Sequence, residues 1–147
     1  MVPRCLKNFG FTNISLVEEQ ATPDGNFPTV KSPNPEESSA LEMAIDKAQK
    51  EGASLVMATD PDADRVGIAV KNDKGEFVLL NGNQTAAVLL YYIFRKWKEN
   101  GKHTGKEYMV KTIVTSELLF DIDDKNHIER YDVLTGFMWI ADIIRKN

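Results

Sequence analysis

Three aspartates stand at alternate positions in the stretch ATDPDADRVG, residues 58–67, and an arginine follows the third. In a tight loop the carboxylates of Asp60, Asp62 and Asp64 would lie within a few ångströms of one another, where like charges repel. A hard divalent cation removes this repulsion, and Mg²⁺ prefers carboxylate oxygens while it keeps open positions for water or a phosphate. The spacing therefore predicts a divalent-cation site.

The aspartates also have a simpler explanation, in which they are solvated loop residues that point away from one another. A calcium-binding EF-hand is a third explanation, but its required glycine would fall on Arg65 and its closing glutamate on Lys71. The residues after the aspartates read as a hairpin, whereas an EF-hand needs flanking helices. The sequence therefore fits an EF-hand badly.

A phosphatase of the haloacid-dehalogenase type is an enzymatic alternative, in which Asp60, directly after an apolar strand, is itself the nucleophile. Thr115 or Ser116, at the end of a later strand, would assist it. This mechanism needs a lysine followed by an acidic pair, whereas here the acidic pair at 123–124 precedes Lys125. The order of these residues disfavours the phosphatase.

The chain before the aspartates predicts a helix and a strand that position them. Asn34 suits the N-cap, Pro35 the first helical position and Glu37 the closing residue of a capping box. Apolar residues then recur with the helical period up to Gly52, which suits a helix end. The apolar strand at 54–59 is expected to be buried on both faces, as parallel strands are, with the aspartates at its carboxyl end.

Further elements are predicted on both sides of this unit. Strands are expected at 13–19 and, as the two arms of a hairpin, at 66–70 and 76–80. A long helix follows at about 84–99, and the apolar character of its first half predicts that this half is buried. The polar, glycine-containing stretch at 101–107 is the expected domain boundary.

Beyond this boundary the chain continues as a second α/β run. The predicted elements are a strand at 108–114, a helix at 117–125, a strand at 130–134 and a helix at 137–145. We therefore expect an α/β fold with a first domain at 1–105 and a partial second α/β unit at 106–147.

Composition excludes several classes of partner. The chain has 147 residues with 18 Lys and Arg against 22 Asp and Glu, a formal charge of -4, which argues against non-specific nucleic-acid binding. The longest wholly apolar run, Ala86 to Phe94, is too short to span a membrane. The only cysteine, Cys5, excludes an intramolecular disulfide, so a cytoplasmic location is expected.

The stretch ATDPDADRVGIAV resembles the metal-binding loop of the α-D-phosphohexomutases, the phosphoglucomutase and phosphomannomutase superfamily. VEEQATPDGNFPTVKSPNPEE resembles the segment before that loop, and LNGNQTAAVLL the helix start after it. IVTSELL and YDVLTGFMWIADII resemble the beginning of the family's third domain. The resemblance implies most of domain II without its first strand, a three-layer α/β/α fold with a mixed sheet, followed by a partial domain III.

The resemblance also implies a reaction and roles for residues. Family members interconvert hexose 1-phosphate and 6-phosphate through a phosphoserine and a bisphosphorylated sugar, with Mg²⁺ held by the residues that correspond to Asp60, Asp62 and Asp64. Arg65 would steady phosphate oxygens. The turn at 135–137, Thr135, Gly136 and Phe137, would lie close to the sugar. Relatives often carry a lysine directly after this turn, whereas this chain has Met138, whose side chain cannot relay a proton.

The resemblance leaves parts of the reaction unassigned. No serine loop of the family's nucleophilic type is present, because the Ser38–Ser39 pair falls within a predicted helix and Ser116 at a strand end. We therefore expect a fragment that is inactive alone and that needs domains I and IV, and the rest of domain III, to act on its sugar phosphate.

The PDGNFP and LTGF stretches favour a phosphoglucomutase. A phosphomannomutase or a phosphopentomutase-like relative stays open, as does a non-enzymatic module that binds a divalent cation. We expect neither a nucleic-acid nor a membrane partner.

Overall fold

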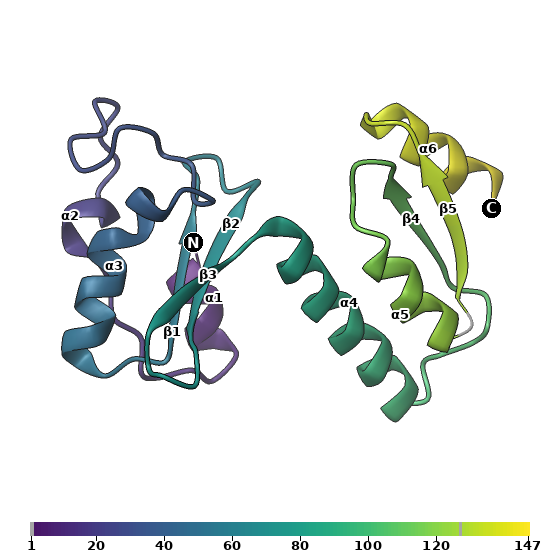
Figure 1. The fold of residues 1–147 in the computed structure, drawn as a ribbon, viewed down its shortest axis with the longest axis horizontal. Coiled ribbons are helices and arrows are strands. Elements are labelled where there is room, and N and C mark those ends of the chain that lie inside the picture. Colours follow the sequence, from purple (N-terminus) through teal and green to yellow (C-terminus); the bar gives the residue numbers. More distant parts are fainter. Residues whose placement is uncertain (1, 127) are drawn as a thin grey trace. The chain divides into compact units, whose positions relative to one another are not determined.

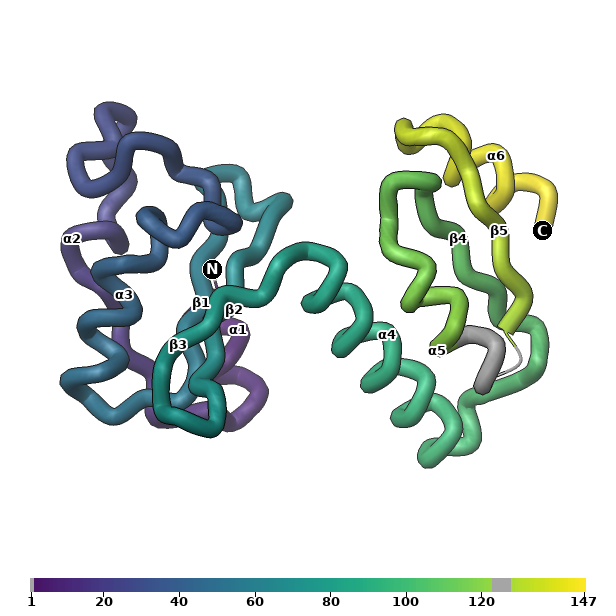
Figure 2. Tube along the Cα trace, in the orientation of Figure 1, coloured from purple at the N-terminus to yellow at the C-terminus, as the bar shows by residue number. Residues whose placement is uncertain are grey.

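The computed structural model describes residues 2–126 and 128–147, which form two compact units (Figures 1 and 2). The first unit ends at Leu80 and the second begins at Asn81. The sequence-based boundary after residue 105 differs from this division, because it assigned the long helix at about 84–99 to the first domain. Both units combine helices with a sheet, so the expected α/β fold class is confirmed.

The first unit begins with the short helices α1 (Val2–Asn8) and α2 (Glu18–Ala21). The strand predicted at 13–19 is wrong, since residues 11–17 have no regular structure and α2 begins at Glu18. Phe11 and Leu16 are 60% and 40% exposed, so the apolar residues of this segment do not pack as a strand's buried face would.

Helix α3 (Ser38–Glu51) is the main helix of the first unit. It starts later than predicted, because Asn34 accepts the Glu36 N–H through its side chain (3.1 Å) and shapes a turn before the helix instead of capping it. The residue at the N-cap is Glu37, and its side chain makes no capping bond. The predicted end is confirmed, since Gly52 adopts a left-handed φ of 73° there.

The sheet of the first unit is antiparallel and consists of β1 (Leu55–Thr59), β2 (Val66–Lys71) and β3 (Phe77–Leu80) in that order. The predicted β2–β3 hairpin is confirmed. The expectation that the first strand is parallel and buried on both faces is wrong. Strand β1 pairs antiparallel with β2, and its Leu55 and Met57 are exposed while Val56 is buried.

One face of this sheet packs against α3 and forms the core of the first unit (Figure 1). The buried apolar side chains are Leu41 and Ala48 from the helix, Val56 from β1 and Ala69 from β2. Leu41 and Ala69 have no exposed surface at all. This core fixes β1 and β2 beside each other and so fixes both ends of the loop that joins them.

The second unit contains α4 (Gly82–Glu99), β4 (Tyr108–Thr112), α5 (Leu118–Asn126), β5 (Glu129–Val133) and α6 (Phe137–Lys146). The strands and helices predicted for this part of the chain are all present. Strands β4 and β5 pair in parallel, and Figure 1 shows α5 on one side of them and α6 on the other. Parallel pairing brings the carboxyl ends of the two strands to the same edge of the sheet.

Helix α4 begins with a capping box, in which Asn81 accepts the Gln84 N–H (2.9 Å) and the Gln84 side chain accepts the Asn81 N–H (3.0 Å). The apolar first half, which was expected to be buried, is buried only in part. Thr85 and Ala87 are buried, whereas Val88 and Leu89 are 61% and 49% exposed. Within the described residues, no helix has the length and apolar character needed to cross a membrane.

Candidate metal centre

The three predicted cation ligands lie in the β1–β2 loop, residues 60–65. The pairing of Thr59 with Val66 closes the hairpin at the base of this loop. Within it, the Ala63 N–H donates to the Asp60 carbonyl (3.1 Å), and Ala63 adopts a left-handed φ of 59° that is uncommon for a residue with a side chain. This turn folds the second half of the loop back toward Asp60.

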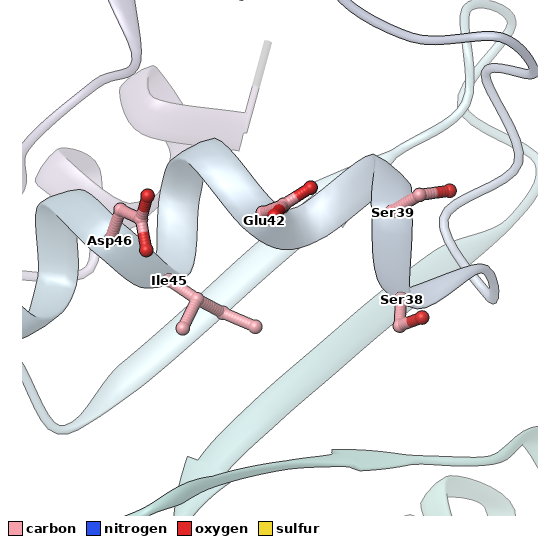
Figure 3. Close-up of a pocket in the computed structure, with 5 residues that line it drawn as sticks. All are labelled: Ser38, Ser39, Glu42, Ile45 and Asp46. Carbon is pink, nitrogen blue, oxygen red and sulfur yellow. The ribbon is translucent and has the colours of Figure 1, made fainter.

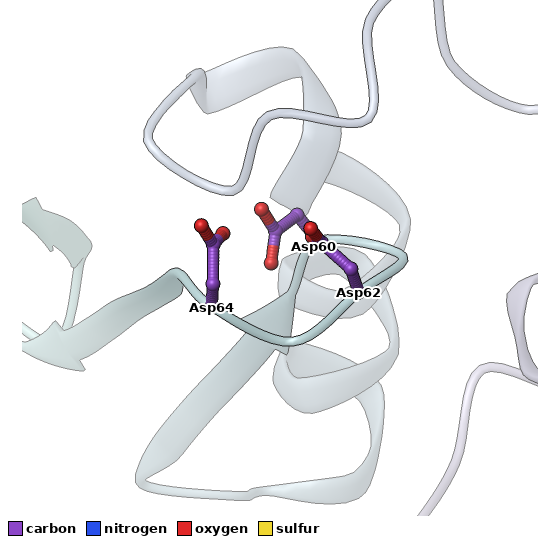
Figure 4. A group of neighbouring side chains, drawn as sticks. All are labelled: Asp60, Asp62 and Asp64. Atoms are coloured by element: carbon purple, nitrogen blue, oxygen red, sulfur yellow. The ribbon is translucent and has the colours of Figure 1, made fainter.

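The turn gathers the three carboxyl groups on one side of the loop (Figure 4). One oxygen from each of Asp60, Asp62 and Asp64 lies within 4.8 Å of the other two. Asp60 is buried, with 3% of its surface exposed, whereas Asp62 and Asp64 are exposed. A set of carboxylate oxygens with two members open to solvent fits a hard divalent cation that also binds water or a phosphate.

Arg65 satisfies the buried carboxylate of Asp60. Its backbone N–H donates to Oδ1 of Asp60 (3.0 Å) and its side-chain Nε–H donates to Oδ2 (2.8 Å). The same Nε lies 3.6 Å from Oδ1 of Asp64. The arginine that the sequence placed behind the aspartates therefore contacts two of them.

These contacts shift the pKa values of the loop in opposite directions. Burial alone would raise the pKa of Asp60. Three hydrogen bonds together hold that pKa below its ordinary value: one from the backbone N–H of Arg65, one with the Asp64 side chain and one from the Arg65 side chain. The hydrogen bond to Asp60, and then the charges of Asp60 and Asp62, raise the pKa of Asp64. The hydrogen bond to Asp60 also raises the pKa of Arg65. Asp60 is thus held in its charged form, whereas the neighbours of Asp64 disfavour its charged form.

A close contact between the backbones of Pro35 and Gly67 positions the end of the loop. The Pro35 side chain is fully buried, and its carbonyl oxygen lies so near Gly67 that a Cβ on this glycine would be 2.0 Å from it. Gly67 is the second residue of β2, just after the loop. Only a glycine there leaves room for the turn before α3, so the two segments position each other.

Lys111 is a buried charge that the sequence analysis did not single out. Its Nζ donates to Glu117 (3.0 Å), Asp132 (3.2 Å) and the carbonyl of Thr115 (3.3 Å), and it lies 4.3 Å from the centre of the Phe120 ring. Burial would lower the pKa of Lys111, but the two carboxylates raise it above its ordinary value. The available signal was a lysine in the middle of an otherwise apolar strand pattern.

Two sequence models of one family match the chain. The model of phosphoglucomutase/phosphomannomutase alpha/beta/alpha domain II matches residues 1–75, and that of alpha/beta/alpha domain III matches residues 81–147. The chain belongs to the phosphoglucomutase/phosphomannomutase family. The gap between the matched regions contains the division of the structure at Leu80.

Individual relatives agree with this assignment. Phosphoglucomutases of Staphylococcus aureus strains MRSA252 and USA300 are 42% and 41% identical to the chain over 146 residues. Each match covers 99% of this chain and 26% of the relative, so the chain spans about a quarter of the length of these relatives. The crystal structure of a "putative phosphomannomutase" from Thermus thermophilus is similar with a TM-score of 0.59 and 28% identity, over 78% of this chain and 24% of that one.

The residues that the family resemblance marks as sugar contacts lie in the second unit. Thr135 follows β5, and Gly136 is the N-cap of α6 with a φ of 125°, a conformation that favours glycine. Phe137 and Met138 begin the helix and are 75% and 70% exposed. The structure thus brings the aspartates together with Arg65, and places the turn at 135–137 at the edge of a different sheet.

The serines that the sequence analysis set aside have structural roles or lie on a helix surface. The Ser116 hydroxyl accepts the Leu118 N–H (3.2 Å) and so contributes to the start of α5. The Ser38–Ser39 pair opens α3, as expected for residues within a helix. It lines a surface depression along this helix together with acidic side chains one turn apart (Figure 3); the lining residues are Ser38, Ser39, Glu42, Ile45 and Asp46.

Proposed function

We propose that this chain provides the cation-binding loop and part of the sugar site of a Mg²⁺-dependent phosphoglucomutase. The observation that carries the proposal is the gathering of Asp60, Asp62 and Asp64 within 4.8 Å in a chain of this family. The activity is the interconversion of hexose 1-phosphate and 6-phosphate, an intramolecular phosphotransfer that makes the enzyme an isomerase.

The β1–β2 loop would hold the cation through its three carboxylates. When bound there, Mg²⁺ supplies positive charge to the phosphoryl group in transfer, which is the main requirement of phosphoryl-transfer catalysis. Asp60 keeps its negative charge down to low pH because Arg65 donates two hydrogen bonds to it. The exposed Asp62 and Asp64 would provide the two ligands that are open to solvent.

Arg65 is proposed as a phosphate-binding residue. A guanidinium offers several donors in one plane, which matches the oxygens of a phosphate. The Arg65 side chain is 54% exposed, so its outer nitrogens are open to a ligand. In the second unit, Thr135, Gly136 and Phe137 are proposed to contact the sugar, and the exposed Met138 offers no proton there.

Glucose phosphates are the proposed substrates, because the curated relatives that resemble the chain at 42% and 41% identity are phosphoglucomutases. The resemblance to a "putative phosphomannomutase" at 28% identity keeps a mannose phosphate as the alternative, beside a phosphopentomutase-like substrate. We propose a cytoplasmic location, since the single cysteine, Cys5, needs no oxidising compartment.

A chimera tests this function. In it, the chain replaces the 146 matched residues of the Staphylococcus aureus phosphoglucomutase, and a coupled assay follows the conversion of glucose 1-phosphate to glucose 6-phosphate. We expect turnover by the chimera, and a loss of about a hundredfold or more when Asp62 and Asp64 are both changed to Asn.

The 147-residue chain alone, in the same assay, is expected to give no turnover, because we propose that the phosphoserine belongs to a domain outside these residues. A chimera that folds, as judged by circular dichroism, and has no turnover would contradict the proposed function. Turnover by the isolated chain would contradict its dependence on further domains.

A further inference from the structure

Both carboxylate oxygens of Asp60 have a partner from one and the same residue. Arg65 holds Oδ1 through its backbone N–H (3.0 Å) and Oδ2 through its side-chain Nε–H (2.8 Å). The Nε also lies 3.6 Å from Oδ1 of Asp64. The guanidinium therefore lies against two of the three carboxylates that would hold a cation.

A divalent cation on the same carboxylates would lie next to this guanidinium. Two positive charges that share one carboxylate repel each other, and the repulsion is strongest where water is excluded. The Asp60 side chain is only 1% exposed, so solvent screens the two charges poorly on that side. The arrangement thus favours one cation at a time on Oδ2.

The two hydrogen bonds of Arg65 differ in how easily they can be given up. The backbone N–H belongs to the residue that precedes β2, and the pairing of Val66 with Thr59 fixes it in the hairpin. The side chain is 54% exposed and can turn into solvent without disturbing the core. Asp60 would keep its orientation through Oδ1 while Oδ2 becomes open to another cation.

We propose that Arg65 and a divalent cation compete for Oδ2 of Asp60, so that cation binding releases the guanidinium and frees its donors for phosphate oxygens. This inference rests on the proposed function, because the cation and the phosphate are those of the proposed reaction. By thermodynamic reciprocity, an anion that draws Arg65 away from Asp60 tightens cation binding by the same factor. The loop would then take up the cation and the phosphate cooperatively.

Nuclear magnetic resonance of the ¹⁵N-labelled 147-residue chain, titrated with MgCl₂, tests the competition directly. We expect the backbone amides of residues 60–65 and the Arg65 Nε–H signal to shift with one common saturation curve. Exchange of the Arg65 Nε–H with water should accelerate about tenfold or more, as the loss of a charge-assisted hydrogen bond implies. The Arg145 Nε–H, in the second unit, is the internal control and should not change.

Substitutions provide an independent measurement. Arg65→Gln removes the competitor, and its Mg²⁺ affinity should rise about tenfold over that of the wild type, whereas Arg65→Lys, which keeps a flexible positive charge, should show a smaller rise. Arg145→Gln removes an arginine of the second unit that pairs with Asp142 (3.2 Å), and it should bind Mg²⁺ as the wild type does.

Three results would overturn the inference. If Mg²⁺ shifts the amides of residues 60–65 while the Arg65 Nε–H keeps its position and exchange rate, the competition is wrong and the proposed cation site stands. If Arg65→Gln binds Mg²⁺ no more tightly than the wild type, Arg65 does not compete with the cation, and the proposed cation site again stands. If Mg²⁺ shifts none of these signals, the competition and the cation site of the proposed function both fail.

Discussion

The three aspartates of the β1–β2 loop differ in what surrounds each carboxylate. Asp60 is buried and its two oxygens accept hydrogen bonds from Arg65, so a substitution there disturbs the loop as well as any bound cation. Asp62 and Asp64 are exposed. Their substitution removes a predicted ligand without removing either partner of the hydrogen bonds between Asp60 and Arg65, which makes them the residues of choice for testing the site.

The side chain of Glu107 predicts how the stability of the fold depends on pH. It accepts the Thr104 N–H and hydroxyl (2.8 Å each) and the Gly105 N–H (2.9 Å), and these bonds, the one from the Thr104 backbone first, lower the pKa of Glu107 from 4.5 to about 2. A lowered pKa stabilises the fold above the unfolded value, so this stabilisation is complete above about pH 4.5 and disappears as the pH falls toward about 2.

We therefore expect Glu107→Gln to unfold in less urea than the wild type at pH 7, and the difference to narrow as the pH falls from 4.5 toward 2. Urea unfolding followed by signals of the second unit at several pH values measures this difference. A difference that stays constant or widens in acid would show that the Glu107 carboxylate is not held in its charged form by these bonds.

At the scale of elements, the β1–β2 loop depends on a contact between segments that lie far apart in the sequence. Gly67 of β2 lies against the carbonyl of Pro35, in the turn before α3. The core side chains Leu41, Val56 and Ala69 hold the same helix and strands together. The orientation of the carboxylates is thus set by the packing of α3 on the sheet as much as by the loop itself.

Gly67→Ala tests this contact. The new Cβ would lie 2.0 Å from the Pro35 carbonyl oxygen, which is backbone and moves only with the turn, so we expect the first unit to lose about 1–3 kcal/mol of stability. Gly25→Ala is the matched control, because a Cβ there meets nothing within 4 Å, and it should be nearly neutral. Equal urea midpoints for the two variants would contradict the positioning role of the contact.

The sequence predicted correctly those features that depend on residues close together in the chain. The helix end at Gly52 and the β2–β3 hairpin depend on residues next to them, and both were predicted correctly. The gathering of the three aspartates depends on one short loop, and it was expected as well. The strand predicted at 13–19 was wrong, and the first half of α4 is buried only in part. Both features depend on partners elsewhere in the chain that the local pattern does not reveal.

The features that were missed depend on contacts between residues that are distant in the sequence. Lys111 is bonded to Asp132, 21 positions away in the sequence and on the neighbouring strand, so its burial follows from the parallel register of β4 and β5. The approach of Pro35 to Gly67 spans a whole helix and strand. Neither contact leaves a local pattern that sequence analysis can recognise.

At the scale of the whole molecule, the two units correspond to two domain models of one family. The division at Leu80 falls between the regions matched by domain II and domain III, and the chain spans 26% of the phosphoglucomutases that it resembles. We therefore propose that the cation loop of the first unit and the turn at 135–137 of the second act in one mutase reaction, each contributed by its own sheet.

Calorimetric titration of the 147-residue chain with MgCl₂ measures whether the three aspartates bind a divalent cation. We expect saturable, weak binding by the wild type and a loss of at least about tenfold in affinity when Asp62 and Asp64 are both changed to Asn. Asp73→Asn, in the turn of the β2–β3 hairpin, removes one exposed carboxylate elsewhere in the same unit and should bind as the wild type does. A double variant that binds Mg²⁺ as tightly as the wild type would contradict cation binding by the three aspartates.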